Sequence, residues 1–139
     1  MGIFLYREEP YTDMEELVKN DMMAQKYGIE LVESRPGSCR VSMKVRRDML
    51  NAYGATHGAV IYALTDVAFA VTCNSGGVKS VALAMNINYR RPAHEGEVLT
   101  AEGYEESAGK TTALCRIKVT NGEGKLVAVA DGLAFRQRQ

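Results

Sequence analysis

The chain has 139 residues, of which 46% are hydrophobic, and its 17 basic and 17 acidic side chains give a formal net charge of zero. This length predicts a single domain over residues 1–139 that can close a core without disulfides or metals. Nucleic acids and anionic membranes attract proteins with a clear basic excess, so the balanced charge excludes both as main partners.

The cysteines and the first residues of the chain indicate in which cellular compartment the protein is expected. Cys39, Cys73 and Cys115 are an odd number of thiols among apolar neighbours, and none belongs to a CxxC pair. We expect them to be buried and reduced, in a cytoplasmic protein. The start, MGIFLYREEP, has no apolar run after a basic segment and predicts no signal peptide. The nearly apolar stretch 58–73 is short for a membrane span and contains Asp66.

The first predicted element is an amphipathic helix. Thr12 and Glu15 have the spacing of a capping box, and the apolar residues behind them recur at helical intervals. These apolar residues are Met14, Leu17, Val18 and Met22. We therefore expect a helix over about 12–27 that Gly28 ends.

The middle of the chain passes from strand spacing to helix spacing. From Ser38 apolar and polar residues alternate, which predicts a strand, and a polar loop follows at about 47–57. The stretch GAVIYALTDVAFAVTC then has large apolar residues on one helical face and small residues on a second. The small ones are Ala59, Ala63, Ala70 and Cys73. We expect a central helix over about 58–75, covered by a sheet on one side and closely approached on the other.

Four alternating runs follow this helix and predict four strands in hairpin-like succession. They are 81–90, 97–106, 113–119 and 126–135, with a hairpin turn over 121–124. Helices gathered on one face of an antiparallel sheet make an α+β fold, and a curved sheet around residues 58–75 buries that helix on both sides.

Three residues around the start of the central helix have types suited to catalysis. Asp66 is a carboxylate inside an apolar helix, where it is costly unless paired or functional; the alternative is a structural bond to a loop. Gly58 opens the helix, where free N–H groups stabilise an oxyanion; the alternative is that it only permits a tight entry. Asn51 orients a carbonyl or a water, or is an ordinary loop residue. His57 lies where a cation is disfavoured, so we expect it neutral, structural and able to contact substrate.

The segment MLNAYGATHGAVIYALTDVAFAVTCNS resembles the signature of the hotdog-fold acyl-CoA thioesterases, most closely those of phenylacetate degradation. The shared spacing is Asn-x2-Gly-x2-His-Gly-x7-Asp, followed by Ala-Phe-Ala and Cys-Asn-Ser. The resemblance continues through MNINYRRPAHEGEVLTAEG and GKTTALCRIKV and so covers most of the chain from about residue 38. It implies a hotdog fold, in which a curved antiparallel sheet wraps one long central helix.

The resemblance also implies roles for the residues of the motif. Asp66 would be the catalytic carboxylate, acting as general base on water or as nucleophile on the thioester. The Gly58 N–H would polarise the thioester carbonyl, and Asn51 would hold the carbonyl or the attacking water. The chain departs from the family at Ala59, where a second glycine is usual, and at Ala82, where some relatives carry a hydroxyl.

The function implied is hydrolysis of an acyl-CoA to a free acid and CoA. Arg91 and Lys110 resemble the family's phosphate-contacting positions, and Arg90, beside Arg91 at a strand end, is a further candidate cation for the phosphates. No metal and no cofactor is implied, since CoA is part of the substrate. One alternative is a hotdog hydratase or dehydratase, which would need a catalytic His beside a carboxylate. Another is a non-catalytic acyl-CoA sensor, which would not need Asp66.

The chain is also expected to act as a homo-oligomer, a dimer or a tetramer whose dimers share a continuous sheet. The small helix face and a row of small and polar strand residues favour close contact between copies. The row is Ala82, Ala84, Asn86 and Asn88. Gly58 and Asp66 of one helix lie about 12 Å apart along its axis, too far to act on one thioester group. The sequence therefore predicts active sites shared between two chains.

Overall fold

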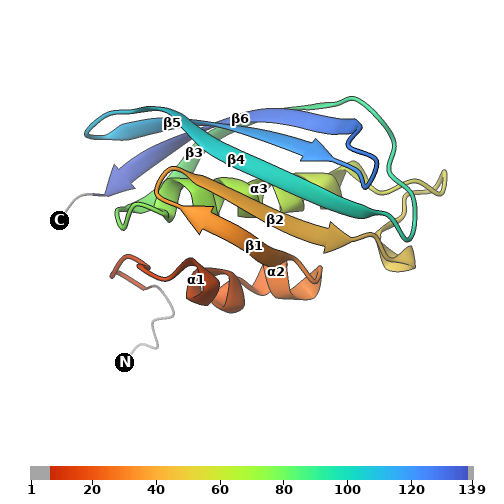
Figure 1. Ribbon diagram of the computed structural model, residues 1–139, viewed down its shortest axis with the longest axis horizontal. Helices are drawn as coiled ribbons and strands as arrows, with labels where there is room; N and C mark the ends of the chain where they lie inside the picture. Colours follow the sequence, from red (N-terminus) through yellow and green to blue (C-terminus); the bar gives the residue numbers. More distant parts are fainter. Residues whose placement is uncertain (1–6, 138–139) are drawn as a thin grey trace.

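The computed structural model describes residues 7–137 and arranges their strands in one six-stranded antiparallel sheet of order β1-β2-β4-β5-β6-β3. The strands are β1 (Glu30–Arg35), β2 (Ser38–Lys44), β3 (Lys79–Tyr89), β4 (Val98–Ala108), β5 (Thr112–Thr120) and β6 (Leu126–Gln137). The central helix α3 (Gly58–Asn74) runs along one face of this sheet, and a short 3-10 turn, η1 (Arg47–Met49), precedes it (Figure 1). This arrangement confirms the predicted α+β fold with a long central helix.

The predicted N-terminal helix over 12–27 is wrong, because the chain forms two short helices there. These are α1 (Met14–Asn20) and α2 (Met22–Lys26), both near β1 in Figure 1. Between them Asp21 is extended, and its carboxylate accepts the N–H groups of Met23 and Ala24 at 3.0 Å. Aspartate favours such cap bonds over a place inside a helix. Asp13, and not Thr12, caps α1.

The strands do not all follow one another as hairpins. β4, β5 and β6 are joined in succession as predicted, but β3 pairs with β6 and forms an edge of the sheet. A bulge between Ala82 and Ala84 shifts the register of β3, so the predicted row of small and polar residues does not stay on one face. Leu83 in this bulge is 58% exposed. The edge strand beside α3 therefore carries exposed apolar surface.

Most of α3 is buried, from Val60 to Asn74, as its composition predicts. One stripe stays open and contains Ala59, Tyr62 and Asp66. Of the predicted small face, only Ala59 is exposed and Ala70 half-buried, because Ala63 and Cys73 belong to the core. The free surface of α3 is thus centred on Asp66.

Two glycines of the sheet let α3 lie close to it. A Cβ on Gly132 in β6 would lie 2.6 Å from ring carbons of Phe69, and one on Gly103 in β4 would overlap the Thr72 hydroxyl. Side chains at these positions would push the helix outward. The helix is therefore seated in two gaps of the sheet.

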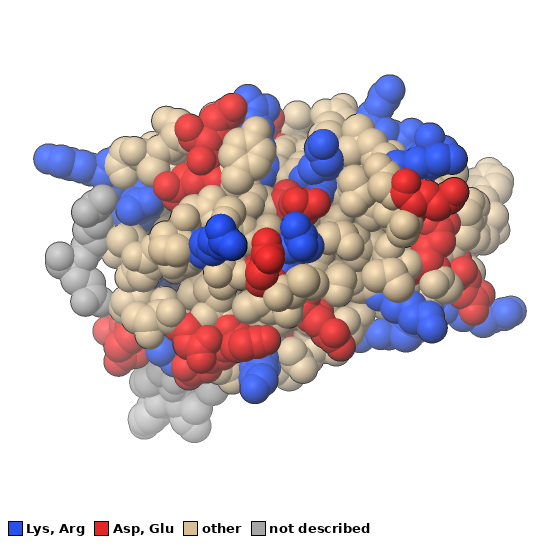
Figure 2. Space-filling model, viewed as in Figure 1, with Lys and Arg blue, Asp and Glu red and all other residues tan. Residues whose placement is uncertain are grey.

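Acidic and basic side chains are interspersed over the face shown in Figure 2, in keeping with the zero net charge. Arg40, for example, lies 3.7 Å from Glu33 and 3.9 Å from Glu102. Within residues 7–137 we find no helix long and apolar enough to cross a membrane.

Candidate active site

The start of α3 presents an open backbone donor. His57 is the N-cap, and its Nδ1 accepts the Ala59 N–H at 3.1 Å, while its carbonyl accepts the Val60 N–H at 2.9 Å. The Gly58 N–H has no acceptor among the residues that the structure describes. A free N–H at the positive end of a helix dipole is suited to binding a carbonyl oxygen that becomes negative. The Nδ1 lone pair of His57 is thus used to cap the helix.

Asn51 closes the loop before α3 and keeps one end of its amide free. Its Oδ1 accepts the N–H groups of Tyr53 at 2.9 Å and Ala55 at 3.1 Å, and its own N–H donates to the Ala55 carbonyl at 2.7 Å. The oxygen is thus used by the fold, while the structure gives Nδ2 no bond within residues 7–137. The Asn51 Nδ2 can therefore donate a hydrogen bond to a carbonyl or a water. Its Oδ1 is not free to accept a hydrogen bond from a water.

A cleft of about 360 Å³ joins several of the predicted site residues. Asn51, Gly58, Arg90 and Arg91 all line it. His57 does not line it, and Lys110 lines a different cavity beside Phe135, at the other end of β6. A single chain therefore places the predicted carbonyl donors beside two of the three predicted phosphate contacts.

Tyr89 also lines this cleft and was not predicted from the sequence. Its hydroxyl donates to the Gly58 carbonyl oxygen at 3.0 Å. Loss of solvent contact raises the pKa of this hydroxyl, with Tyr62 adding to the effect, so it stays a donor at neutral pH. In the sequence, the only local feature that could have indicated Tyr89 as a site residue is its position directly before Arg90-Arg91-Pro92.

Asp66 lies outside the cleft, on the open stripe of α3 and about 12 Å along the axis from Gly58. Within residues 7–137 its carboxylate makes no hydrogen bond and no ion pair, so the single chain offers no partner for a structural role. The side chain reaches solvent, yet partial burial raises the pKa of this carboxyl, and the charge of Asp21 raises it further. The result is an uncommitted carboxylate of increased basicity.

Comparison with known proteins places this geometry in a family. Residues 53–128, which include Gly58, Asp66 and Tyr89, match the thioesterase superfamily. The acyl-coenzyme A thioesterase PaaI of Escherichia coli K12 is 36% identical over 120 residues, covering 86% of each chain. Human acyl-coenzyme A thioesterase 13 is 36% identical over 103 residues, covering 72% of this chain and 74% of the human protein.

Solved structures agree with these sequence matches. The E. coli PaaI protein of the phenylacetic acid degradation operon aligns with a TM-score of 0.86 and 35% identity, covering 88% of this chain and 89% of that one. A hypothetical thioesterase of Streptococcus pneumoniae, solved with coenzyme A, aligns with a TM-score of 0.77 and 32% identity, covering 80% and 87%. The chain therefore belongs to the thioesterase superfamily and has the hotdog fold. Within that superfamily it is similar to the PaaI acyl-CoA thioesterases, which confirms the resemblance found in its sequence.

Proposed function

We propose that this protein hydrolyses acyl-CoA thioesters to a carboxylic acid and free CoA, in active sites that each combine residues of two chains. Membership of the thioesterase superfamily supports the reaction. The observation that carries the shared site is the separation of two halves within one chain. Asn51 and Gly58 present open donors in one cleft, while Asp66 lies uncommitted outside it.

The proposed reaction uses three groups. The thioester carbonyl oxygen accepts from the Gly58 N–H and the Asn51 Nδ2, which draws electron density from the carbonyl carbon. Asp66 of the partner subunit removes a proton from a water as that water attacks this carbon, and a raised pKa makes a carboxylate a better base. When the tetrahedral intermediate collapses, the C–S bond breaks and the leaving thiolate takes the proton back. The products are the acid and CoA.

A homodimer built through β3 would assemble this site. β3 is an edge of the sheet, and its exposed Val81 and Leu83 adjoin the open stripe of α3. Pairing β3 with its own copy about a two-fold axis extends the sheet, and it brings the two α3 helices together in antiparallel orientation. We propose that two such dimers form a homotetramer. A monomer in sedimentation velocity at micromolar concentration would contradict the dimer.

The same pairing gives Lys110 a place in CoA binding. Antiparallel β3 strands bring Lys79 of one chain toward Tyr89 of the other. Lys79 pairs with Gln137, and the neighbouring Arg136 N–H donates to the Thr111 carbonyl at 2.8 Å, so Lys110 lies at this same end of the sheet. We propose that Arg90 and Arg91 of one chain, with Lys110 of the partner subunit, meet the phosphates of CoA.

Two further expectations accompany this function. The hydrolysis uses water and the chain's own residues, so we propose no metal and no cofactor, with CoA entering as part of the substrate. Cys39, Cys73 and Cys115 are buried free thiols, which suits a reducing compartment, and we propose a cytoplasmic location.

The function is tested by thiol release from a panel of acyl-CoAs. Hydrolysis yields one CoA thiol per acid, whereas a hydratase changes the absorbance of an enoyl-CoA without releasing thiol. A non-catalytic sensor binds acyl-CoA in calorimetry and releases none. The wild-type protein should release thiol from at least one acyl-CoA, and the Asp66→Asn variant should release it more slowly by about a hundredfold or more.

A further inference from the structure

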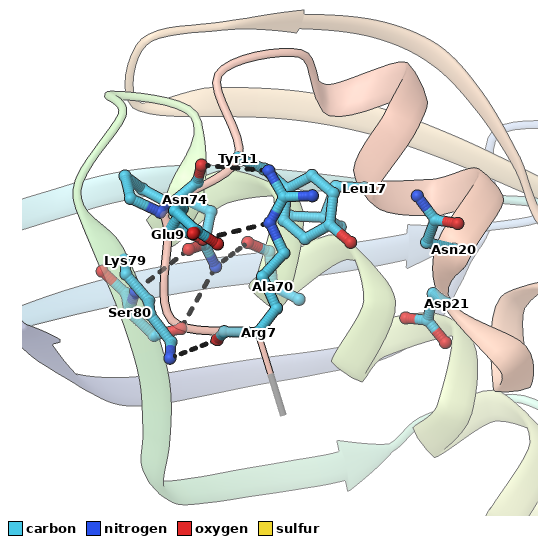
Figure 3. A pocket seen from close by; sticks show the side chains of 11 residues that line it. Arg7, Glu9, Tyr11, Leu17, Asn20, Asp21, Ala70, Asn74, Lys79 and Ser80 are labelled. Carbon is cyan, nitrogen blue, oxygen red and sulfur yellow. Dashed lines mark hydrogen bonds between the residues drawn. The ribbon is translucent and has the colours of Figure 1, made fainter. Parts of the chain in front are cut away.

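A second cavity, of about 270 Å³, lies along α3 beyond Asp66. Ala70 and Asn74 line it, and they follow Asp66 by one and two helical turns on the same side of the helix. Figure 3 shows that its other walls come from the segment before α1, from α1 itself and from the start of β3. We call it the N-terminal cavity.

Tyr11 is a fixed part of the wall of this cavity. The Arg7 guanidinium stacks on its ring at 3.8 Å from the centroid (Figure 3). The same guanidinium lies 3.7 Å from the Glu16 carboxylate in α1. The Lys79 ammonium donates to the Arg7 carbonyl at 2.7 Å, which attaches the same segment to β3. Tyr11 is therefore held between two elements of the fold.

Within the described residues, the polar groups of the cavity are bonded to the chain, with the exception of the Glu9 carboxylate. The Asn74 amide donates to the Ala70 carbonyl at 2.8 Å and accepts the Ser80 N–H at 2.9 Å, and Asp21 caps α2. Arg7 and Lys79 hold the N-terminal segment. Besides Glu9, what remains for a bound group is apolar surface. It comes from Tyr11, Leu17 and Ala70.

We propose that the N-terminal cavity receives the acyl group of the substrate and that Tyr11 limits the length of that group. The inference rests on the proposed function, in which Asp66 acts at the thioester carbon. The thioester has two arms, and the cationic cleft of Arg90 and Arg91 suits the CoA arm. The apolar cavity directly beyond Asp66 suits the other arm.

The size of the cavity defines the substrate class. A cavity of roughly 150 Å³ holds a benzene ring, and one water-sized group occupies about 30 Å³. The N-terminal cavity therefore fits a ring with a short linker, or a straight chain of about eight carbons. Arg7, Asp21 and Lys79 are bonded to the chain, and the remaining charged group of the cavity, the Glu9 carboxylate, repels an anion, so the acyl group should carry no negative charge.

The test measures kcat/KM for acetyl-, hexanoyl-, decanoyl- and phenylacetyl-CoA. The wild-type protein should favour hexanoyl- and phenylacetyl-CoA over decanoyl-CoA. Tyr11→Ala should raise the ratio of decanoyl to hexanoyl activity by about tenfold, the usual scale for a methylene or two in an apolar pocket. Leu17→Phe, which fills the cavity from α1, should lower the ratio of hexanoyl to acetyl activity by about the same factor.

Tyr27→Ala is the matched control, because Tyr27 is also partly buried against the core but does not line the cavity. It should leave all the ratios as they are. The proposal is overturned if Tyr11→Ala and Leu17→Phe leave the ratios unchanged, or if Tyr27→Ala shifts them equally. If the wild-type protein hydrolyses none of these thioesters, the proposed function fails. Calorimetric titration of the wild-type protein and Tyr11→Ala with hexanoyl- and decanoyl-CoA then decides whether Tyr11 limits chain length. The quantity compared is the ratio of the decanoyl-CoA affinity to the hexanoyl-CoA affinity.

Discussion

The hydroxyl of Tyr89 donates a hydrogen bond to the carbonyl oxygen of Gly58 at 3.0 Å, and its ring lies 3.3 Å from the place of a Cβ on that glycine. The last residue of β3 is thereby attached to the first residue of α3. The contact restrains the position of Gly58, whose N–H is the proposed donor to the thioester carbonyl. It also leaves no free space for a side chain at position 58.

Gly58→Ala should therefore displace the Tyr89 ring and reduce kcat by about tenfold or more, because small errors in the position of a reacting group are costly. Gly76→Ala is a matched control, since no atom lies within 4 Å of the added Cβ and the backbone there is not left-handed. Steady-state kinetics of both variants make the comparison. Equal kcat values for the two would show that the Tyr89 contact does not position the donor.

Asp66→Asn should lower kcat by about a hundredfold or more, the usual scale for a general base, and change KM much less. The carboxylate has no bonding partner among the described residues 7–137, so the substitution should not lower the melting temperature. Thiol release and thermal unfolding of the same samples give both values. A variant that is unstable as well as inactive would point to a structural role.

The raised pKa of Asp66 predicts a dependence on pH. Activity should rise with pH through an inflection above the ordinary carboxyl value of 3.8, because only the ionised form accepts a proton. The folded chain binds this proton more tightly than the unfolded chain. The free energy of unfolding should therefore fall as pH rises from the unfolded pKa through the folded one, and Asp66→Asn should lack this fall.

Asp21→Asn tests the electrostatic part of that shift. It removes a charge that raises the pKa of Asp66, while asparagine caps helices as well as aspartate does. The inflection in the pH profile of kcat should move to lower pH with little change in the melting temperature. An inflection that stays in place would exclude Asp21 as a source of the shift.

Complementation tests the shared site. Asn51→Asp keeps the oxygen that accepts from Tyr53 and Ala55 but removes the free donor, and it can be refolded together with Asp66→Asn. A mixed dimer has one site with both native residues and one site with neither. Random pairing should restore roughly a quarter of wild-type activity, since half of the dimers are mixed. Proven mixed dimers without activity would refute the shared site.

The CoA contacts are tested by single Ala substitutions of Arg90, Arg91 and Lys110. Each should raise KM and leave kcat largely intact, because phosphate contacts hold the ground state and the transition state equally. Lys19→Ala, on the exposed surface of α1, is the control for loss of a positive charge. A change in kcat without a change in KM would contradict the assignment.

The sequence predicted the elements of this fold better than their order. Periodicity located α3 and five of the strands, because burial on one or two sides leaves a local pattern. It missed the break at Asp21, where a cap bond competes with a helix that the apolar spacing also allows. It also missed the pairing of β3 with β6, since partners far apart in the chain leave no local mark.

The residues of the candidate site also fall into those that the sequence predicted and those that it did not. The spacing of Asn51, Gly58 and Asp66 is local and was visible as a motif. Tyr89 reaches Gly58 across 31 positions, and Tyr11 reaches the N-terminal cavity from before α1, so both required the folded chain. The distance between Gly58 and Asp66 did follow from the sequence, because a helix has a fixed rise.

The two gaps that Gly103 and Gly132 leave in the sheet have a mechanical consequence. An α-helix behaves as a stiff rod over this length, and Thr72, which fills the gap at Gly103, lies about 21 Å along it from Gly58. A methyl group at position 103 would push this end of α3 away from the sheet. Because the helix is stiff, the shift would also move Gly58, the proposed oxyanion donor, at its other end. In the proposed mechanism, the alignment of the Gly58 donor therefore depends on how closely α3 packs against the sheet at Gly103 and Gly132.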